Sequence, residues 1–331
     1  LSIRRYPVRW FVGLGAATLA VPDGATLALD GDNGLLIVDP ETSEWASYER
    51  RVTHQRAQLT RRHMLRDQPG RLASGEHVTI WANISHPDEA HAALQQGAEG
   101  IGLFRTEFLF LGREAPPDEE EQFQAYCTTV RTMDGRPVII RTLDVGGDKR
   151  LAYLDMPREA NPALGIRGLR TSMHIPRLFQ TQLRAMLRAA IHGDLRILLP
   201  MITTPDDLDW AHIQIRAAAD SLAREAIEHR VDVPIGIMIE TPAAAVTADL
   251  LASRAAFFSI GSNDLAQYTL AVDRDSATIA PRYPHDSPAV MRLVAQAVNA
   301  AALARLPVCI CGEIAAIPEV VTPLIGLGVY Q

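Results

Sequence analysis

From about residue 76 to the end of the chain, short apolar runs alternate with longer amphipathic segments. The short runs suit buried strands, and the longer segments keep apolar residues at helical spacing. Such an alternation is typical of βαβ units around a parallel sheet, so it restricts the fold more than any other feature. The candidate strands lie at 78–84, 100–104, 137–143, 195–201, 235–239, 256–260, 307–311 and near 328–331.

This series matches a (β/α)₈ TIM-type barrel, which typically takes roughly 250 residues. Amphipathic segments such as 178–193 and 206–229 fill the intervals between the strands. An open, doubly wound sheet is the alternative architecture for the same alternation. We expect the eighth strand to be cut short by the chain end at Gln331.

The first part of the chain has a different pattern. Apolar runs at 10–12, 26–29 and 35–38 predict strands, and the turn DGDNG between the last two predicts a hairpin. Because so few strands cannot form a sufficient core by themselves, we interpret residues 1–40 as the trailing part of a β-rich domain. Residues 41–73 begin with a long segment that lacks Gly and Pro, and they predict a connecting helix. The barrel is then expected over 74–331.

Composition excludes several classes of protein. The net charge is −7, and a basic footprint for nucleic acid is therefore missing. No apolar run reaches the length of about 18 residues that a membrane span needs, and the N-terminal residues do not resemble a signal peptide. Three cysteines do not suggest a disulfide framework, so a reducing cytoplasm is expected. Because the chain starts at Leu1 rather than Met, we expect a fragment.

Polar side chains follow the candidate strands, all at the carboxyl end. In a barrel these ends meet at one rim, where such folds place their chemistry. Taken in chain order, the residues are Arg105, Arg141 with Asp144, Glu240, Asn263 with Asp264, Arg274 in a later segment, and Cys311. Each of these residues alone is weak evidence for a functional site. Their common position at the carboxyl ends of the strands is stronger evidence.

The residue types indicate an anion and a metal. Guanidinium groups match phosphate and carboxylate oxygens, while Glu240 and Asp264 supply the oxygen ligands that Mg²⁺ prefers. The rim therefore suits a small phosphorylated carboxylate bridged by Mg²⁺. A structural alternative remains for Asn263 and Asp264, because both are good helix caps.

Cys311 is the least expected residue at this rim. It lies two positions after Cys309, so the two thiols should face the same side of one strand. A thiol with a pKa near its ordinary value of about 8.5 is protonated at neutral pH and could give a proton to carbon. For Cys127 and Cys309 a core role is sufficient.

The motifs GIGLFRTEFLF, IIRTLDVGGDK, NPALGIRGLR, LPMI, IMIETPAA, FFSIGSNDLAQYTLAVDR and CICGE occur in this order. From about residue 76 onward the chain thereby resembles the phosphoenolpyruvate–protein phosphotransferases, known as enzyme I of the bacterial sugar phosphotransferase system. RTLDVGGDK, and RTEFLF followed by DEEEQFQAY, favour enzyme I over pyruvate phosphate dikinase and phosphoenolpyruvate synthase. Residues 1–40 resemble, more weakly, the trailing part of the family's swivelling phosphohistidine domain.

The resemblance implies a role for each matched residue. Phosphoenolpyruvate would be bound by Arg105, Arg141, Arg274, Asn263 and Asp264, with Arg167 as a further phosphate contact. Glu240 and Asp264 would be the Mg²⁺ ligands. Cys311 would be the proton donor that converts enolpyruvate to pyruvate.

The resemblance also implies partners. The phosphoryl group would pass to a histidine and then to a histidine-containing phosphocarrier protein, and the barrel would form a homodimer in the cytoplasm. The acceptor motif GG-x-[ST]-SH is absent, and the first histidine in the chain is His54. Open alternatives are a fused multiphosphoryl transfer protein, a nitrogen-type paralogue, a dikinase-type enzyme and a non-catalytic phosphoenolpyruvate-sensing module.

Overall fold

The structure, a computed structural model, describes residues 15–31, 34–146 and 151–331. It divides into two compact units that meet in sequence between Gln68 and Pro69. The run expected to form a strand at 10–12, and residues 147–150 of the glycine-containing segment, lie outside the described residues. Each unit is considered by itself.

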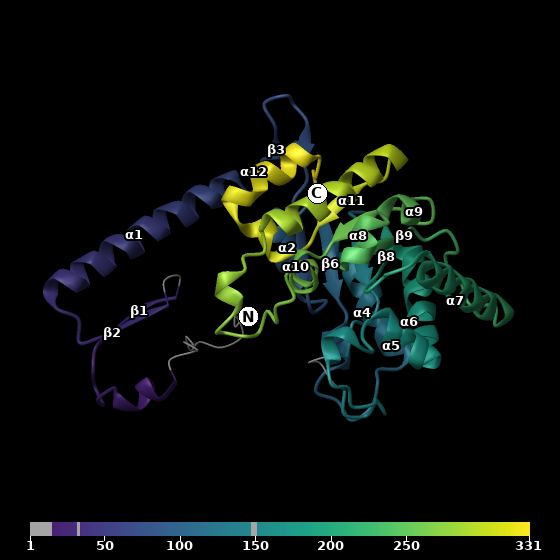
Figure 1. The fold of residues 1–331 in the computed structure, drawn as a ribbon, viewed down its shortest axis with the longest axis horizontal. Helices are drawn as coiled ribbons and strands as arrows, with labels where there is room; N and C mark the ends of the chain where they lie inside the picture. Colours follow the sequence, from purple (N-terminus) through teal and green to yellow (C-terminus); the bar gives the residue numbers. More distant parts are fainter. Residues whose placement is uncertain (1–14, 32–33, 147–150) are drawn as a thin grey trace. The chain divides into compact units, whose positions relative to one another are not determined.

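The first unit contains the predicted hairpin and helix (Figure 1). A short 3₁₀ helix, Gly15–Ala20, precedes β1 (Leu27–Asp30), which pairs antiparallel with β2 (Leu35–Val38). Helix α1 (Thr42–Leu65) follows, and Glu41 and Glu44 form a capping box at its start. The role of residues 1–40 as part of a phosphohistidine domain stays a prediction.

The second unit is built around a seven-stranded parallel sheet in which each strand pairs with its neighbours in the chain. The strands are β5 (Trp81–Ile84), β6 (Gly100–Arg105), β7 (Val138–Arg141), β8 (Leu195–Leu199), β9 (Ile235–Ile239), β10 (Phe258–Ile260) and β11 (Val308–Ile310). A doubly wound sheet requires the strand order to reverse at one point, and no reversal occurs among these strands.

Helices fill most of the intervals and lie outside the curled sheet in Figure 1. They are α2 (Glu89–Gln95), α3 (Glu107–Phe110), α4 (Glu119–Thr132), α5 (Leu169–His174), α6 (Pro176–Ala189), α7 (Pro205–Arg224), α8 (Pro242–Val246), α9 (Ala248–Ala252), α10 (Ser262–Leu270), α11 (Pro288–Ala304) and α12 (Pro318–Leu327). Four 3₁₀ helices add Pro162–Leu164, Ala190–His192, Ala280–Arg282 and Glu313–Ala316.

Two of the predicted strands needed correction. The run 78–84 is not one strand, because Val78 pairs with Gly70 in a short hairpin of β3 (Gly70–Arg71) and β4 (His77–Val78). No strand is assigned near 328–331 within the part of the chain that the structure describes. Those residues nevertheless occupy the eighth position of the barrel.

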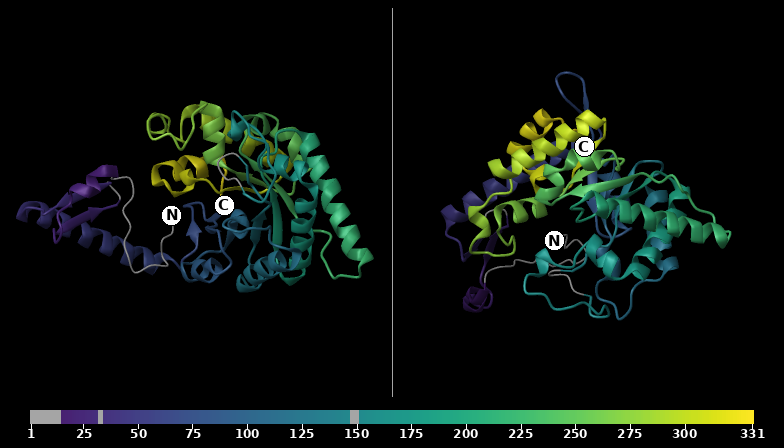
Figure 2. Two further views of the ribbon diagram at one scale, coloured as in Figure 1. Left: turned by 90° about the horizontal axis from the view of Figure 1, so that it is seen from below. Right: turned by 45° about the vertical axis from the view of Figure 1, so that its right-hand side comes forward.

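The last residues hydrogen-bond to both edges of the sheet. The amide of Ile310, at the end of β11, donates to the carbonyl of Gln331 at 3.0 Å, and the amide of Thr79, just before β5, donates to the carbonyl of Tyr330 at 2.8 Å. The C-terminus accordingly lies beside the blue segment that leads into β5 (Figures 1 and 2). The predicted TIM-type barrel architecture is therefore confirmed, with seven assigned strands.

Both faces of the sheet are buried, as expected for a barrel of parallel strands. Side chains such as Ile140 and Ile239 pack against the surrounding helices. Their neighbours in sequence point the other way, because side chains alternate along a strand. The inner cluster consists of Leu103, Ile139, Leu198, Met238, Phe257, Cys309 and Cys311. Cys309 and Cys311 thus share a face, as their spacing predicted.

None of the helices in the described ranges is both long enough and apolar enough to cross a membrane.

Candidate active site

A cavity of about 380 Å³ opens at the carboxyl ends of the strands. The structure brings every residue expected at the site into its wall: Arg105, Arg141, Arg167, Glu240, Asn263, Asp264, Arg274 and Cys311. The wall also includes Asp144, Met238, Asp275, His285 and Glu313. Residues separated by more than two hundred positions in the chain therefore meet in one place, because most of them end or closely follow a strand of the same barrel. Arg167 and Arg274 reach the cavity from later segments, before α5 and after α10.

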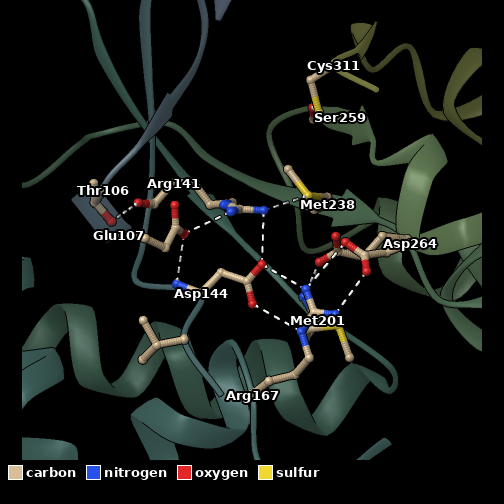
Figure 3. Close-up of polar contacts among 12 residues, drawn as sticks. Thr106, Glu107, Arg141, Asp144, Arg167, Met201, Met238, Ser259, Asp264 and Cys311 are labelled. Atoms are coloured by element: carbon tan, nitrogen blue, oxygen red, sulfur yellow. Dashed lines mark hydrogen bonds and ion pairs between the residues drawn. The ribbon is translucent and has the colours of Figure 1, made fainter. Parts of the chain in front are cut away.

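Arg141 is buried at the end of β7 and held by two carboxylates (Figure 3). Its Nη2 donates to Glu107 Oε1 at 2.8 Å, and its Nη1 lies 3.1 Å from Asp144 Oδ2. The backbone amide of Asp144 also donates to Glu107 Oε1, at 3.1 Å. The guanidinium is therefore fixed in place before any ligand binds.

Arg167 lies in the segment before α5 and is the second buried guanidinium. Its Nη2 is 3.0 Å from Asp144 Oδ2 and its Nη1 is 2.9 Å from Asp264 Oδ1, so Asp144 joins the two arginines (Figure 3). Its Nη1 also donates to the hydroxyl of Tyr268 at 3.2 Å. Gly146 forms an isolated bridge with Arg167 at φ 117°, where an added Cβ would collide with the Ile166 carbonyl.

Arg105 and Arg274 are less constrained. The guanidinium of Arg105 forms no hydrogen bond or ion pair with any residue in the described ranges. Arg274, which follows α10, lies 3.5 Å from Asp264 Oδ1, and its side chain is 25% exposed. These two guanidinium groups are the ones most available to an incoming anion.

Glu240, at the end of β9, has one oxygen bound and one without a partner. Its Oε1 accepts from the Met201 amide at 2.6 Å, and its buried Oε2 has no hydrogen-bond partner among the described residues. Met201 directs this amide from the left-handed region, at φ 57°. Burial raises the pKa of Glu240 well above its ordinary value, with the nearby Asp264 adding to the shift.

These features fit a divalent cation. A buried carboxylate oxygen without a donor is costly, and a cation would satisfy it. No group of three or more His, Cys, Asp or Glu side chains in the described ranges is arranged as a closed metal site. A cation held by Glu240 and Asp264 would therefore need further ligands from substrate and water, which is the usual arrangement for Mg²⁺.

The alternative that Asn263 and Asp264 only cap a helix was wrong. Gly261 is the N-cap of α10, and the two residues lie in the first turn without a side-chain capping bond. Asp264 instead pairs with arginines, and Asn263 Oδ1 accepts from the Glu313 amide at 3.0 Å. The amide nitrogen of the Asn263 side chain has no described partner and is left for a ligand.

Cys311 lies just beyond β11 with its sulfur in the cavity wall. Its Sγ accepts from the Ser259 hydroxyl at 3.3 Å (Figure 3) and is 3.5 Å from the Ile260 carbonyl. Burial raises the pKa of the thiol, so it stays protonated at neutral pH. Cys309 does not line the cavity and remains in the barrel interior.

The charges of the wall show what could bind. Carboxylates outnumber guanidiniums, with Asp144, Glu240, Asp264, Asp275 and Glu313 against Arg105, Arg141, Arg167 and Arg274. Because the raised pKa of Glu240 favours its protonated form, the other four carboxylates balance the four guanidiniums, and the wall offers no net positive charge to a multiply charged anion unless a cation enters with it. The four guanidiniums still offer the directional contacts that a phosphate or carboxylate needs.

Sequence reasoning assigned no role to several residues that shape this site. Glu107, Met201, Ser259 and Tyr268 all contact a predicted site residue. The only sequence signals were the position of Glu107 just after a strand and the presence of Ser259 inside an apolar strand.

A barrel of this kind, with four guanidinium groups and an unpartnered carboxyl oxygen of Glu240 in a cavity at its rim, defines a class of α/β domains with a polar cavity at the carboxyl ends of the strands. Residues 60–331 match the family described as the PEP-binding domain of PEP-utilising enzymes. The chain belongs to this family.

Curated relatives agree with the family. The chain is 42% identical over 320 residues to the phosphoenolpyruvate-protein phosphotransferases of Bacillus sp. (strain S) and Geobacillus stearothermophilus, covering 97% of this chain and 55% of each relative. It is also 42% identical over 322 residues to a multiphosphoryl transfer protein of Xanthomonas campestris pv. campestris, covering 97% of this chain and 38% of that protein. The chain spans about half the length of the phosphotransferases it matches.

Among solved structures, a citrate lyase from Burkholderia xenovorans has a TM-score of 0.44 at 16% identity, covering 73% of this chain and 64% of that one.

Proposed function

We propose that this chain is the phosphoenolpyruvate- and Mg²⁺-binding part of a phosphoenolpyruvate–protein phosphotransferase. The parent protein would move the phosphoryl group of phosphoenolpyruvate to a histidine and then to a phosphocarrier protein, and it would release pyruvate. The observation that carries the proposal is the meeting of all the predicted site residues in one cavity. The names of the curated relatives support it.

Two kinds of side chain would take part in binding: those still available to a ligand and those already held by carboxylates. Arg105, Arg274 and the side-chain amide of Asn263 are available to grip the phosphate and carboxylate of phosphoenolpyruvate. Arg141 and Arg167 are already held by carboxylates, so they contribute positive charge at fixed positions and cost no reorganisation.

Glu240 and Asp264 would hold Mg²⁺. The unpartnered Oε2 of Glu240 supports this assignment. When bound, Mg²⁺ would neutralise charge that develops on the phosphoryl group and on the oxygen of the leaving enolate.

Proton transfer to carbon is assigned to Cys311. Its raised pKa keeps the proton on sulfur until an enolate is present, and its sulfur lies in the cavity wall. The histidine acceptor belongs to a domain whose trailing part would be residues 1–40, with residues 41–73 as the linker and 74–331 as the barrel. A homodimer formed through the barrel, and a cytoplasmic location, complete the proposal.

A fused multiphosphoryl transfer protein is the second candidate for the parent protein. It is favoured by the 42% identity to the Xanthomonas protein of that name. Both candidates use the same chemistry at this cavity. The complete set of charged residues argues against a non-catalytic sensing module.

Isothermal titration calorimetry of this chain with phosphoenolpyruvate tests the proposal. We expect binding heat with Mg²⁺ and little without it, because the cavity wall has no net positive charge of its own and one oxygen of Glu240 lacks a partner. Glu240→Gln should abolish the Mg²⁺ dependence, whereas Glu319→Gln, at an exposed position on α12, should not. Equal affinity with and without Mg²⁺ would contradict the proposal.

A further inference from the structure

Ser259 is a polar residue in the apolar interior of the barrel. It lies on β10, is 0% exposed, and pairs in register with Cys309 on β11. The neighbouring inner side chains, such as Leu198 and Met238, carry no hydroxyl. A buried hydroxyl costs stability unless it has a hydrogen-bond partner, so the partner of Ser259 indicates what it does.

The hydroxyl lies between two thiols: it also interacts with Cys309, and its hydrogen bond goes to the sulfur of Cys311. Ser259 Oγ donates to Cys311 Sγ at 3.3 Å (Figure 3), and the sulfur lies 3.5 Å from the Ile260 carbonyl. The sulfur is thus held between one donor and one acceptor, both from β10. This arrangement fixes both the position of the sulfur and the direction of its S–H bond.

The charged groups around Cys311 act in opposing directions. Arg141 and Arg105 favour the thiolate, and Glu240 disfavours it. Arg141 is engaged by Glu107 and Asp144 through its two Nη atoms, and none of the hydrogen bonds found for it in the described ranges goes to Cys311. Ser259 is the neutral donor that touches the sulfur directly.

We propose that Ser259 is a positioning residue that orients the Cys311 thiol and stabilises the thiolate formed when Cys311 protonates the enolate of pyruvate. The inference rests on the function proposed above. In this step the S–H bond breaks and its electron pair stays on sulfur. The electron pair of the enolate forms the new C–H bond at the methylene carbon, which becomes the methyl group of pyruvate. Negative charge therefore moves from the enolate to sulfur, where the Ser259 hydroxyl donates to it.

The first test needs no substrate. The alkylation of Cys311 by iodoacetamide is followed against pH in the 331-residue chain, and peptide mass spectrometry separates it from Cys127 and Cys309. In Ser259→Ala the thiolate loses a donor, so the titration midpoint should rise by about one unit and the rate near neutral pH should fall about tenfold. Ser259→Thr keeps the hydroxyl and should restore the wild-type midpoint.

A matched control separates this effect from the general loss of a buried hydroxyl. Ser172 is a buried serine on α5, and no hydrogen bond joins it to a thiol in the described ranges. Ser172→Ala should leave the alkylation midpoint of Cys311 unchanged. If Ser259→Ala melts at too low a temperature to assay, Ser259→Thr provides the test. A shifted alkylation midpoint of Cys311 in this variant, which keeps the hydroxyl, would overturn the inference.

The second test measures proton transfer to carbon. Exchange of pyruvate methyl protons in D₂O, with Mg²⁺ and inorganic phosphate, is followed by NMR. Ser259→Ala should slow exchange about tenfold while the affinity for phosphoenolpyruvate stays within about twofold, which a merely structural defect would not do.

The two measurements distinguish a failure of the proposed function from a failure of the proposed role of Ser259. A chain that does not bind phosphoenolpyruvate, but whose Cys311 midpoint still rises in Ser259→Ala, would refute the proposed function and keep the Ser259–Cys311 coupling. A chain that binds phosphoenolpyruvate normally, with an unchanged midpoint and exchange rate in Ser259→Ala, would overturn the role of Ser259.

Discussion

Asp144 joins the two buried arginines of the site, so its replacement by Asn gives a quantitative test of the network. Its carboxylate lies 3.1 Å from Arg141 Nη1 and 3.0 Å from Arg167 Nη2. Asp144→Asn preserves the shape of the side chain and removes the negative charge between two guanidiniums. The positive charges of both buried guanidiniums would then be only partly neutralised by the remaining carboxylates.

The expected loss in the free energy of unfolding depends on the carboxylates that remain beside the two arginines. Removing one partner of a buried ion pair costs about 3–5 kcal/mol. Each arginine keeps one other carboxylate, Glu107 at 2.8 Å for Arg141 and Asp264 at 2.9 Å for Arg167. The lower end of the range therefore applies, and Asp144→Asn should lower the free energy of unfolding by about 3 kcal/mol.

Urea denaturation followed by circular dichroism measures this loss. With a denaturant dependence of about 3 kcal/mol per molar urea, the midpoint should fall by about 1 M. The control is Asp209→Asn, which breaks an exposed pair with Arg254 at 3.1 Å and should cost under about 1 kcal/mol. If both variants lose the same small amount, the buried network does not stabilise the fold as argued.

Three further outcomes are expected. Gly146→Ala should lower the melting temperature and weaken phosphoenolpyruvate binding measured by calorimetry. The reason is that a side chain at φ 117° beside the Ile166 carbonyl displaces Arg167. Unchanged affinity would contradict a connection between Gly146 and the position of Arg167. Cys311→Ala should abolish deuterium exchange into the pyruvate methyl group and leave phosphoenolpyruvate affinity within about twofold, so normal exchange in this variant would remove Cys311 from the mechanism. Removal of Mg²⁺ with EDTA should eliminate the rise in melting temperature that phosphoenolpyruvate produces, and a rise that persists would argue that the anion binds without a cation.

Much of the site could be predicted from the order of residue types. Arg105 and Arg141 each end an apolar strand, and Glu240 directly follows another. In a barrel of parallel strands such residues must meet at one rim, so the sequence alone determined that these side chains share one side of the sheet. It predicted the barrel with a doubly wound sheet as the alternative, and the strand order decided between them. The alternation of side chains along a strand likewise placed Cys309 and Cys311 on one face.

The pairing of these residues was decided only by the tertiary structure. Asp144 contacts both Arg141 and Arg167, Ser259 contacts Cys311, and Asn263 contacts the amide of Glu313 rather than capping its own helix. Periodicity tells which face of an element is buried and carries no information on which side chains meet across strands. Those contacts depend on strand register and loop conformation, which the packing of the whole barrel sets. For this reason the partners of the Cys311 thiol and of the arginines appeared only in the folded chain.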